Sequence, residues 1–474
     1  MSNFLDFLDA HPAEHVALID DRDKLTYGRL RSLARRGANV IHSRHGGKNF
    51  LLVSATADAR FITTLLAVIY SGNTPVPIDP NLPEPGREFI KDKCQAAALL
   101  DPLDETALTD GVEVDYRDDS IPMMILFTSG TSGFPKGVIL SHENVISSCR
   151  TMADYLGYHQ YPSSAVVLPL HYSYALLSQV CCMLMVGGRV CLFSNFRNPL
   201  KFSRTVSELQ LETFCGVPST YHALCLFHSL QALSMPSVRV LCSAGAAMDQ
   251  SKYDTIKTIF LNAVFFNNYG MTEAAPRIAY LRDDDPRFHE PTCGKPMAGV
   301  EVVIVNPTTH QPVPEGEQGI LAVRGPNITQ GYLHDPEATQ AAFTRDGYLL
   351  SGDMAYLENG YIYICGRQDD IFNVGGEKVA PLEIERVLNR HPAVELSAVA
   401  GIKDEQRGHV PVAFVKFKES ATRSQLVRYL LEWLPQSKVP VCFMEVSAFP
   451  MTGNGKLQRR QLSLSGSDVL REIT

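Results

Sequence analysis

The sequence predicts an α/β fold: a large N-terminal domain of α/β layers with a β subdomain, followed by a small, mobile α+β C-terminal domain. The chain has 474 residues, which is too long for one compact core. Apolar runs of strand length alternate with helix-length stretches from residue 20 to about 330. Short β-rich pieces follow from Gly299, and a smaller module with helical periodicity follows Arg367. We therefore expect domains at 1–366 and 367–474.

The first half of the chain shows the alternation most clearly. Thr26 can cap a helix from Tyr27 to about Ser43, which has apolar residues near helical spacing on one face. A cluster of prolines around Asp79 is expected to break any regular element. The expected strands are Phe50–Val53, Ala165–Leu168, Arg189–Phe193, Val238–Cys242 and Ala263–Phe266.

The second half changes texture. Strands of a β subdomain are expected at Glu301–Val305, Gly319–Arg324 and Tyr361–Cys365. The last module is expected to hold helices at Pro381–Asn389 and Ser424–Trp433, and strands near Ser397–Ala400 and Val410–Phe417. No Pro/Gly/Ser-rich linker marks the boundary near residues 366–370, so we expect a short hinge there.

Composition excludes several classes of function. Lys and Arg total 43 against 51 Asp and Glu, a net charge of −8, so nucleic acid is not an expected partner. Hydrophobic residues make up 45%, which excludes a disordered chain. No apolar stretch approaches the ~20 residues of a membrane span, and residues 1–10 lack a secretory signal, so we expect a cytoplasmic protein. None of the eleven cysteines forms a Cys-x-x-Cys pair, so we expect these cysteines to form neither disulfides nor a metal site.

The segment Ile125–Gly137 reads ILFTSGTSGFPKG: an apolar strand, a loop of small and hydroxyl residues, and a lysine. Backbone N–H groups and hydroxyls of such a loop can surround a phosphate, because glycine removes the Cβ that would block close approach. The segment is not a Walker A loop, since Lys136 is followed by glycine rather than Ser or Thr. Taken alone, it is either a phosphate-binding loop or a surface turn.

The ten residues from Thr128 to Gly137 closely resemble the signature loop of the adenylate-forming superfamily. This family includes acyl- and aryl-CoA synthetases, adenylation domains of nonribosomal peptide synthetases and beetle luciferases. Weaker similarity at Leu25–Tyr27 and Val76–Pro80 extends the resemblance over almost the whole chain. Four more family motifs appear in the same order: the second nucleotide motif at residues 268–273 (NYGMTE), the ribose motif at 351–353 (SGD), the hinge motif at 366–370 (GRQDD) and the catalytic-lysine loop at 451–456 (MTGNGK).

The resemblance implies a reaction in two halves, in which ATP converts a carboxylate into an acyl-adenylate and a thiol then takes the acyl group. Two anions must meet in the first half, so Mg²⁺, lysines and hydrogen-bond donors are needed. The catalytic residues that the resemblance implies are Lys456, Thr272, Glu273 and Lys136, with Glu273 as the Mg²⁺ ligand.

The resemblance also implies how the nucleotide is held. Tyr269 offers a flat face for adenine, Asn268 offers an amide for the edge of the base, and Asp353 with Arg367 can reach the ribose hydroxyls. Rotation about a hinge at Asp369 would present Lys456 for the first half-reaction, and later a tunnel whose glycines, Gly375 and Gly376, leave room for pantetheine. The implied nucleotide-binding residues are Thr128, Ser129, Gly130, Thr131, Gly245, Ala246, Ala247, Asn268, Tyr269, Gly270, Asp353 and Arg367.

The acid pocket is expected near residues 169–175. Amino-acid-activating relatives place an aspartate at the start of a helix here, whereas this chain has Tyr174, and a phenol lacks the charge that an ammonium group needs. We therefore expect an acyl or aryl acid. His171 and Tyr172 could gate its carboxylate end, and Tyr174, Val217 and Thr220 could form the wall; simple core packing stays open for all five.

We expect an ATP- and Mg²⁺-dependent acid–thiol ligase whose acceptor is CoA or the phosphopantetheine of a separate acyl or peptidyl carrier protein. One alternative is a stand-alone amino-acid or β-amino-acid adenylation enzyme, which would need a pocket carboxylate. Another is a nucleotide-binding regulator without catalysis, which the presence of Lys456 and Glu273 disfavours. The sequence does not distinguish a luciferase-like oxygenase by its second step.

Overall fold

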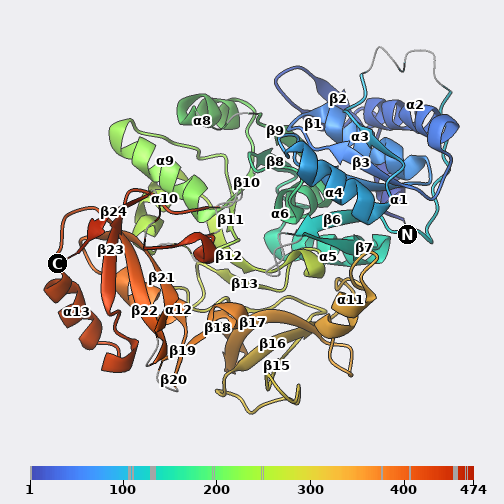
Figure 1. The fold of residues 1–474 in the computed structure, drawn as a ribbon. Helices are drawn as coiled ribbons and strands as arrows, with labels where there is room; N and C mark the ends of the chain where they lie inside the picture. Colours follow the sequence, from blue (N-terminus) through green and yellow to red (C-terminus); the bar gives the residue numbers. More distant parts are fainter. Residues whose placement is uncertain are drawn as a thin grey trace. The chain divides into compact units, whose positions relative to one another are not determined.

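The chain divides into two compact units (Figure 1). Unit 1 is Met1–Val302 with Val323–Leu349, and unit 2 is Val303–Ala322 with Leu350–Thr474. The expected domain boundary at 366/367 stays a prediction. The computed structural model describes residues 3–104, 108, 112–128, 135–194, 196, 198–246, 248, 250–374, 377–404, 407–451, 457–464, 466 and 468–473, without the side chains of 377, 378 and 460.

A mixed sheet forms the framework of unit 1. Its strand order is β14-β13-β12-β11-β10-β8-β9-β1-β2, with parallel neighbours from β12 to β1 and antiparallel pairs at both ends. The loops that follow β10, β11 and β12 therefore gather at one edge, where open α/β sheets bind ligands. The strands are β1 Val16–Ile19, β2 Lys24–Thr26, β8 Ser163–Val166, β9 Arg189–Leu192, β10 Thr213–Gly216, β11 Val240–Ser243, β12 Val264–Tyr269, β13 Ala279–Arg282 and β14 Lys295–Pro296.

Unit 1 also holds a parallel sheet of order β4-β3-β5 and the antiparallel pair β6–β7. The expectation that the prolines here break every regular element is wrong. Pro77 lies inside β4, which is an edge strand and therefore tolerates a residue without a backbone N–H. Pro85 lies in the first turn of α4, where the backbone N–H has no partner within the helix and can be missing. These elements are β3 Phe50–Ser54, β4 Thr74–Ile78, β5 Ala98–Leu100, β6 Met124–Thr128, β7 Lys136–Leu140 and α4 Glu84–Cys94.

The helices of unit 1 cover these sheets with their apolar faces. Thr26 caps α2 as expected, because its hydroxyl accepts a hydrogen bond from the Arg29 backbone N–H at 3.3 Å. The remaining helical segments are α1 Phe4–Ala10, α2 Tyr27–His45, α3 Ala59–Tyr70, α5 His142–Leu156, α6 Ser173–Ala175, the π-helical η2 Leu176–Cys181, α7 Cys182–Met185, α8 Pro199–Glu208, α9 Pro218–Leu230, η3 Gln250–Lys252, α10 Tyr253–Ile259, η4 Thr272–Ala274 and α11 Pro336–Ala342.

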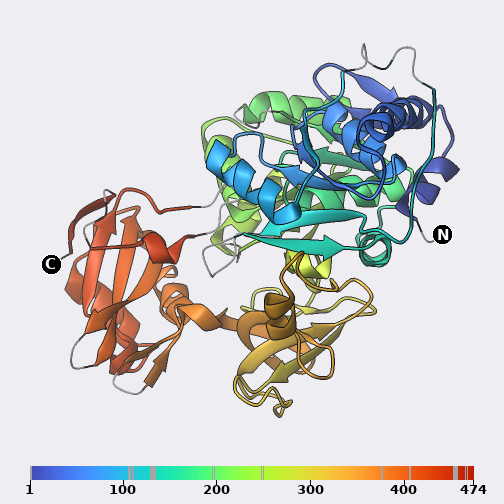
Figure 2. The same ribbon diagram turned by 45° about the vertical axis from the view of Figure 1, so that its right-hand side comes forward.

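A further sheet has the order β15-β16-β17-β18, and unit 2 contains the sheet β20-β19-β22-β23-β24 with β21 paired to β22 (orange to red in Figure 2). Helices α12 and α13 pack their apolar residues into the core of this last sheet. The elements are β15 Glu301–Val305, β16 Gly319–Arg324, β17 Leu349–Glu358, β18 Tyr361–Arg367, η5 Gln368–Asp370, β19 Phe372–Val374, β20 Glu377–Val379, α12 Pro381–Leu388, β21 Val394–Asp404, β22 Gly408–Phe417, α13 Arg423–Leu431, η6 Gln436–Lys438, β23 Cys442–Val446, η7 Arg459–Gln461 and β24 Val469–Glu472.

The expected fold class is confirmed, with a large α/β part and a separate α+β module at the C-terminus. The expected strands are present with shifted ends. The clearest shift is β8, which begins at Ser163 rather than Ala165, because two buried serines pair with β9 and carry no hydrophobic pattern. Eight of the eleven cysteines are buried.

Candidate active site

The predicted phosphate-binding loop joins β6 to β7. Thr128 ends β6 and pairs with Lys136, the first residue of β7. The hairpin is tightly packed next to this point, since a Cβ on Gly137 would lie 3.1 Å from the Ile125 side chain. The hairpin therefore fixes the two ends of the loop. Ser129, Gly130 and Thr131 lie outside the described residues, and their phosphate contacts stay predictions.

A segment around Tyr332 runs along β7. Leu333 donates its backbone N–H to the Gly137 carbonyl at 2.8 Å, and Val138 and Tyr332 form an antiparallel bridge. The Thr329 hydroxyl donates to the carbonyl of Gly331 at 3.1 Å and so fixes the turn that precedes the bridge. These bonds position the Tyr332 ring beside the start of β7.

Two predicted catalytic residues meet at this ring. The Nζ atom of Lys136 lies 4.9 Å from the centroid of Tyr332, a cation–π distance. The Tyr332 hydroxyl donates to Oε1 of Glu273 at 3.0 Å. One tyrosine therefore places a cation and a carboxylate at the end of the hairpin that carries the predicted phosphate-binding loop.

Glu273 lies in η4, the short turn after β12, and is only 8% exposed. Thr329 donates its N–H to the Glu273 carbonyl at 2.8 Å, so the backbone of the turn is fixed as well as the side chain. The neighbouring Thr272 has its hydroxyl 3.0 Å from that of Ser173, at the start of α6. The predicted pair Thr272 and Glu273 thus faces both the phosphate hairpin and the segment expected to hold the acid.

The predicted adenine-binding residues follow β11 and β12. Tyr269 ends β12, and the next residue must be glycine, because a Cβ on Gly270 would lie 1.9 Å from the Pro276 carbonyl oxygen. Gly245 follows β11 with a φ of +90° and is exposed, as is Ala246. Both loops lie at the carboxyl edge of the sheet. Ala247 lies outside the described residues.

The side-chain amide of Asn268 makes two hydrogen bonds within unit 1. Its Oδ1 accepts a hydrogen bond from the Tyr155 hydroxyl at 3.2 Å, and its Nδ2 donates to the Phe266 carbonyl at 3.2 Å. Its amide is therefore engaged inside unit 1, and its role toward adenine stays a prediction.

The two predicted gate residues lie side by side. The rings of His171 and Tyr172 have centroids 4.0 Å apart, and Nε2 of His171 lies 4.0 Å from an oxygen of Asp79. Burial lowers the pKa of His171, and the nearby Asp79 carboxylate opposes this shift. Burial raises the pKa of Tyr172, and so also favours its neutral form. A neutral imidazole and a neutral phenol are therefore favoured here.

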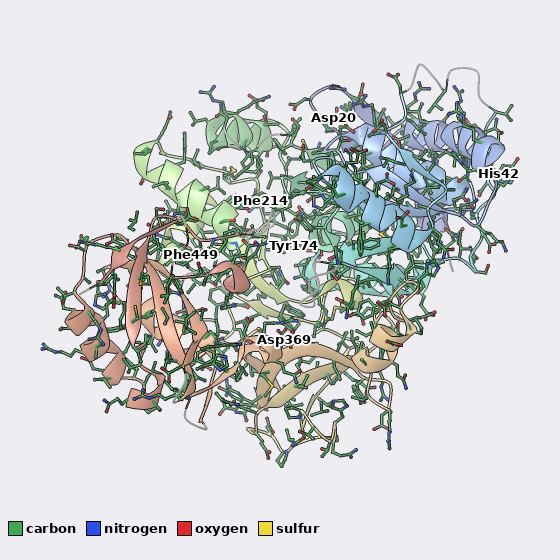
Figure 3. All side chains as sticks on the ribbon, viewed as in Figure 1. Asp20, His42, Tyr174, Phe214, Asp369 and Phe449 are labelled. Carbon is green, nitrogen blue, oxygen red and sulfur yellow. The ribbon has the colours of Figure 1, made fainter. Side chains whose placement is uncertain are left out.

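The predicted wall residues gather around β11. The Tyr174 hydroxyl donates to the Cys242 carbonyl at 3.2 Å, and burial raises the pKa of Tyr174 well above its usual value (Figure 3). The Val217 side chain lies next to Gly245, because a Cβ placed on Gly245 would be 3.7 Å from Cγ1 of Val217. Thr220 lies in the first turn of α9, where its hydroxyl accepts a hydrogen bond from the Val217 N–H at 3.4 Å.

The predicted ribose residues meet within unit 2. Asp353 on β17 pairs in register with Arg367 on β18, and their side chains form an ion pair of 3.1 Å. The Ser351 hydroxyl accepts from the Asp353 N–H at 3.0 Å. The pair thus brings together one acceptor and one donor group of the kind that ribose hydroxyls bind.

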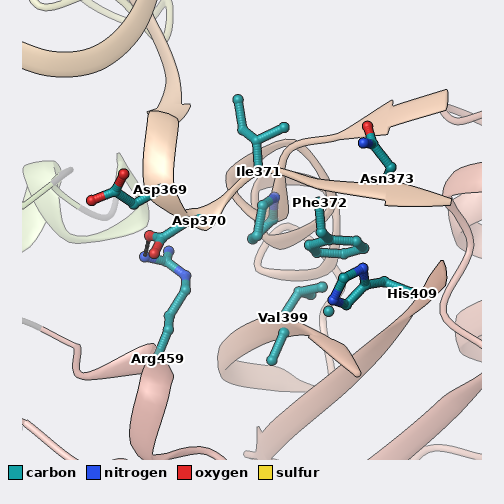
Figure 4. Close-up of a pocket in the computed structure, with 11 residues that line it drawn as sticks. Asp369, Asp370, Ile371, Phe372, Asn373, Val399, His409 and Arg459 are labelled. Atoms are coloured by element: carbon teal, nitrogen blue, oxygen red, sulfur yellow. Dashed lines mark hydrogen bonds and ion pairs between the residues drawn. The ribbon is translucent and has the colours of Figure 1, made fainter. Parts of the chain in front are cut away.

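The predicted hinge residue Asp369 lines a pocket of about 360 Å³ in unit 2 (Figure 4). At one end of this pocket Arg459 forms an ion pair with Asp370 at 3.1 Å, and the same guanidinium donates to both oxygens of Glu385 at 3.1 and 2.6 Å. Lys456, Gly375 and Gly376 lie outside the described residues. Their roles as catalytic lysine and thiol tunnel stay predictions.

Three residues that contact the predicted site were not identified from the sequence. Tyr332 joins Lys136 to Glu273, and Arg277 lies buried beside Tyr174, with its guanidinium carbon 5.5 Å from the ring centroid. Arg459 holds the hinge motif. The only sequence signal was for Arg277, a charge inside the otherwise apolar run from Ala274 to Tyr280.

The described residues include no cluster of three or more His, Cys, Asp or Glu side chains that could hold a metal by themselves. A single protein carboxylate combined with substrate phosphates is the usual way in which proteins bind Mg²⁺, and Glu273 suits that arrangement. As for the membrane, no helix in the part of the chain that the structure describes has the length and apolarity to cross one.

Comparison with known proteins agrees with this geometry. The family model described as AMP-binding enzyme matches residues 6–121 and 101–333, and the AMP-binding enzyme C-terminal domain matches 383–456. The chain is 30% identical over 360 residues to 4-coumarate–CoA ligase 2 of Nicotiana tabacum, which covers 74% of this chain. The chain spans 66% of that ligase's own length.

Solved structures share the whole fold. An ATP-bound RpMatB-BxBclM chimera superposes with a TM-score of 0.87 at 25% identity, covering 97% of each chain. The O-succinylbenzoate coenzyme A synthetase MenE of Bacillus subtilis, in complex with AMP, has a TM-score of 0.87 at 24% identity over 98% of this chain and 99% of its own, a likeness of fold alone. The extent of the family match is decisive: this chain belongs to the AMP-binding enzyme family.

Proposed function

We propose that this protein is an acid–thiol ligase that activates a carboxylic acid with ATP and transfers the acyl group to CoA. In the first half, a carboxylate oxygen attacks the α-phosphorus of ATP, the bond to the β-phosphate breaks, and pyrophosphate leaves. In the second half, the thiol sulfur attacks the acyl carbon, the bond to the phosphate oxygen breaks, and AMP leaves.

The observation that carries the proposal is the group formed by Lys136, Tyr332 and Glu273 at the end of the β6–β7 hairpin. A cation and a carboxylate held at a phosphate-binding loop suit a reaction in which negative charge builds on phosphate oxygens. Mg²⁺, when bound, would neutralise charge on those oxygens. Glu273 would hold it, and the hydroxyl of Tyr332, which donates to Oε1, would orient the carboxylate.

The acid that we propose is acyl or aryl rather than an ordinary α-amino acid. Tyr174 stands where amino-acid-activating relatives place a carboxylate, and burial keeps its phenol neutral. A neutral phenol does not balance an ammonium charge. The 4-coumarate–CoA ligase similarity supports an acid of this kind and CoA as acceptor. A carrier protein is the second candidate acceptor, because Val76–Pro80 resembles carrier-loading relatives as much as CoA-using ones.

The test is pyrophosphate release with ATP and Mg²⁺ across aliphatic acids, aromatic acids and amino acids, each with and without CoA. We expect release with an acyl or aryl acid and formation of its CoA thioester. The Glu273→Gln variant serves as the catalytic control and should lower release by about a hundredfold. ATP binding without release for any acid would favour a nucleotide-binding regulator, and release only with amino acids would overturn the assigned acid class.

A further inference from the structure

Arg277 is the largest side chain in the core of unit 1, and it is 1% exposed. Its Nη2 donates to the Ser178 hydroxyl at 3.3 Å, while its Nη1 has no hydrogen-bond partner among the described residues. No Asp or Glu in the described part of the chain lies within ion-pair distance of it. A buried guanidinium without an anion is costly, because both its charge and its N–H groups have lost water.

The described groups that surround Arg277 are aromatic rings, hydroxyls and thiols rather than carboxylates. Its guanidinium carbon lies 5.5 Å from the ring centroid of Tyr174. Tyr155, Cys215 and Cys242 also act on it. Burial raises the pKa of Tyr155 and Cys242, whereas the pKa of Cys215 is lowered, because its hydrogen bonds with Cys242 and Tyr158 and the charge of Arg277 outweigh burial. Among the described residues, the protein thus supplies aromatic faces, hydroxyls and thiols to this cation, but no carboxylate.

The position of Arg277 places it along the acid-binding segment. It follows Glu273 by one turn of chain, and Asn327 fixes this turn by donating to the carbonyls of Ala274 at 2.8 Å and Arg277 at 2.9 Å. The turn meets the 173–178 segment twice: at Thr272, whose hydroxyl is 3.0 Å from Ser173, and at Arg277 beside Tyr174 and Ser178. The first contact is at the reacting end, so the second lies farther along the same wall.

The 173–178 segment has an unusual local structure at this contact. Ser178 lies in η2, a π-helical stretch, and π-helical turns occur often at functional sites. The next residue, Gln179, is fully buried, and neither of its amide atoms has a hydrogen-bond partner among the described residues. On β12, the side-chain amide of Asn268 accepts a hydrogen bond from the Tyr155 hydroxyl. This wall is therefore polar and incompletely bonded, unlike one built for a purely apolar acid.

Resting on the proposed function, we propose that Arg277 binds a second carboxylate of the substrate, so that the acid activated by this enzyme is a dicarboxylic acid. One carboxylate reacts beside Thr272 and Glu273, and the other meets the planar guanidinium fork, whose donors match a carboxylate. The ligand would supply the carboxylate that the described residues around Arg277 do not. Arg277 is then a specificity-determining residue that takes no part in the bond changes.

The experiment compares each dicarboxylic acid with its monoamide, which has the same size and keeps one reactive carboxylate. Hexanedioate and benzene-1,4-dicarboxylate are tested this way, together with hexanoate and benzoate. We expect kcat/KM for pyrophosphate release to be about tenfold to a hundredfold higher for a diacid than for its monoamide. Equal or better use of the monoamides and monoacids leaves the proposed function intact and overturns the role of Arg277.

The Arg277→Met variant keeps the length of the side chain and removes the charge. We expect it to lose the diacid preference while the KM for ATP stays unchanged. Arg282→Met is the matched control, because Arg282 is exposed and pairs with Asp284. An equal loss of activity toward every acid in Arg277→Met, at unchanged diacid preference, would contradict the proposal. If that variant does not fold, the wild-type comparison decides alone.

A binding readout separates this proposal from the proposed function. We expect diacids, without ATP, to raise the melting temperature of the wild-type protein by about 2 °C more than their monoamides do, and to lose that advantage in Arg277→Lys, which keeps the cation but not the fork. If no acid releases pyrophosphate, the proposed function fails, and this difference in melting temperature still supports the anion site. No difference overturns it.

Discussion

Tyr332 has two distinct tasks at the candidate site, and they can be separated by removing one atom. Its ring lies under the Lys136 ammonium group, and its hydroxyl donates to Glu273. A group that orients a metal ligand usually affects metal affinity more than it affects the chemical step. The hydroxyl should therefore act on Mg²⁺, and the ring should act on the lysine.

Tyr332→Phe should accordingly raise the Mg²⁺ concentration needed for half-maximal pyrophosphate release by about tenfold, with a much smaller change at saturating Mg²⁺. The measurement is a Mg²⁺ titration at fixed ATP and acid. Tyr348→Phe is the matched control, since the Tyr348 hydroxyl also bonds a carboxylate, Glu301 at 2.9 Å, but on the exposed surface. Equal Mg²⁺ curves for wild type and Tyr332→Phe would show that the hydroxyl does not orient Glu273.

The motifs predicted Lys136, Glu273, Asp353 and Arg367, because each belongs to a short run whose pattern is visible in sequence. The contacts that organise them were not predictable. Tyr332 meets Glu273 across 59 positions of the chain, and nothing local to either residue indicates the other. Arg277 was not predicted: it interrupts the apolar run from Ala274 to Tyr280, but that pattern alone does not show that its guanidinium is buried without a carboxylate partner. The pairing is a product of tertiary packing.

At the scale of single elements, α5 depends on the charge state of its first residue. His142 is 4% exposed, and its Nδ1 accepts a hydrogen bond from the Phe4 N–H at 3.2 Å, which requires a neutral ring. Burial lowers the pKa of His142 to about 4, with Asp119 and Asp6 opposing the shift. A protonated ring would lose this bond and place a cation at a helix N-terminus, where the backbone dipole disfavours it.

The stability of the protein should therefore fall with pH in a defined window. The unfolded state binds the His142 proton below its ordinary pKa of 6.5, whereas the folded state binds it only near 4, so stability is complete above 6.5 and is lost as the pH falls toward 4. The contribution amounts to about 3 kcal/mol of unfolding free energy.

The check is urea unfolding at about pH 7, 5.5 and 4.5, where the unfolding free energies of wild type and His142→Asn are compared. The asparagine Oδ1 can accept the Phe4 N–H and does not titrate, so the variant should lose less stability across the window. Parallel losses in the two proteins would assign the acid sensitivity to other groups.

The ion cluster of Arg459, Asp370 and Glu385 ties three elements of unit 2: η7, η5 and α12. Glu385 is 4% exposed and also accepts the Val399 N–H at 2.8 Å. The paired carboxylates raise the pKa of Arg459 against the opposing effect of burial. Removing the arginine would leave a buried carboxylate without its cation.

Arg459→Met should thus destabilise unit 2 by about 3 kcal/mol. Arg471→Met is the control within the same unit, because the pair of Arg471 with Glu445 is exposed and should be worth about 1 kcal/mol or less. Hydrogen exchange of the backbone N–H groups in α12 and β21 reports the loss locally. If exchange there is as slow in Arg459→Met as in Arg471→Met, the cluster does not stabilise this unit.

At the scale of the whole molecule, hydrophobic alternation predicted the fold class and most strands. It missed β4, which contains prolines, and the first two residues of β8, which are serines. Both segments are buried because of their places in the sheets, and a local hydrophobic pattern does not show these places. The family resemblance predicted two half-reactions served by one site. That prediction concerns the chain as a whole, since the two lysines predicted to be catalytic, Lys136 and Lys456, lie in the first and the last third of the sequence.

Lys456→Ala should lower acyl-adenylate formation by about a thousandfold or more and leave thioester formation from supplied acyl-adenylate nearly unchanged. The reason is that a point charge between the two reacting anions is needed only while they approach each other. The two half-reactions are measured separately, by pyrophosphate release and by thioester formation. An equal loss in both would exclude the alternation of two states that the resemblance implies.

The Arg459 cluster also determines where this chain can be recombined with a relative. In a chimera whose crossover lies between Asp370 and Glu385, the two carboxylates come from different parent proteins. Arg459 then pairs with one carboxylate from its own parent and one from the other parent. A crossover before Asp370 moves both carboxylates and their cation together. A chimera that keeps the cluster intact must therefore take Asp370, the last residue of the predicted hinge motif, from the same parent as the C-terminal module.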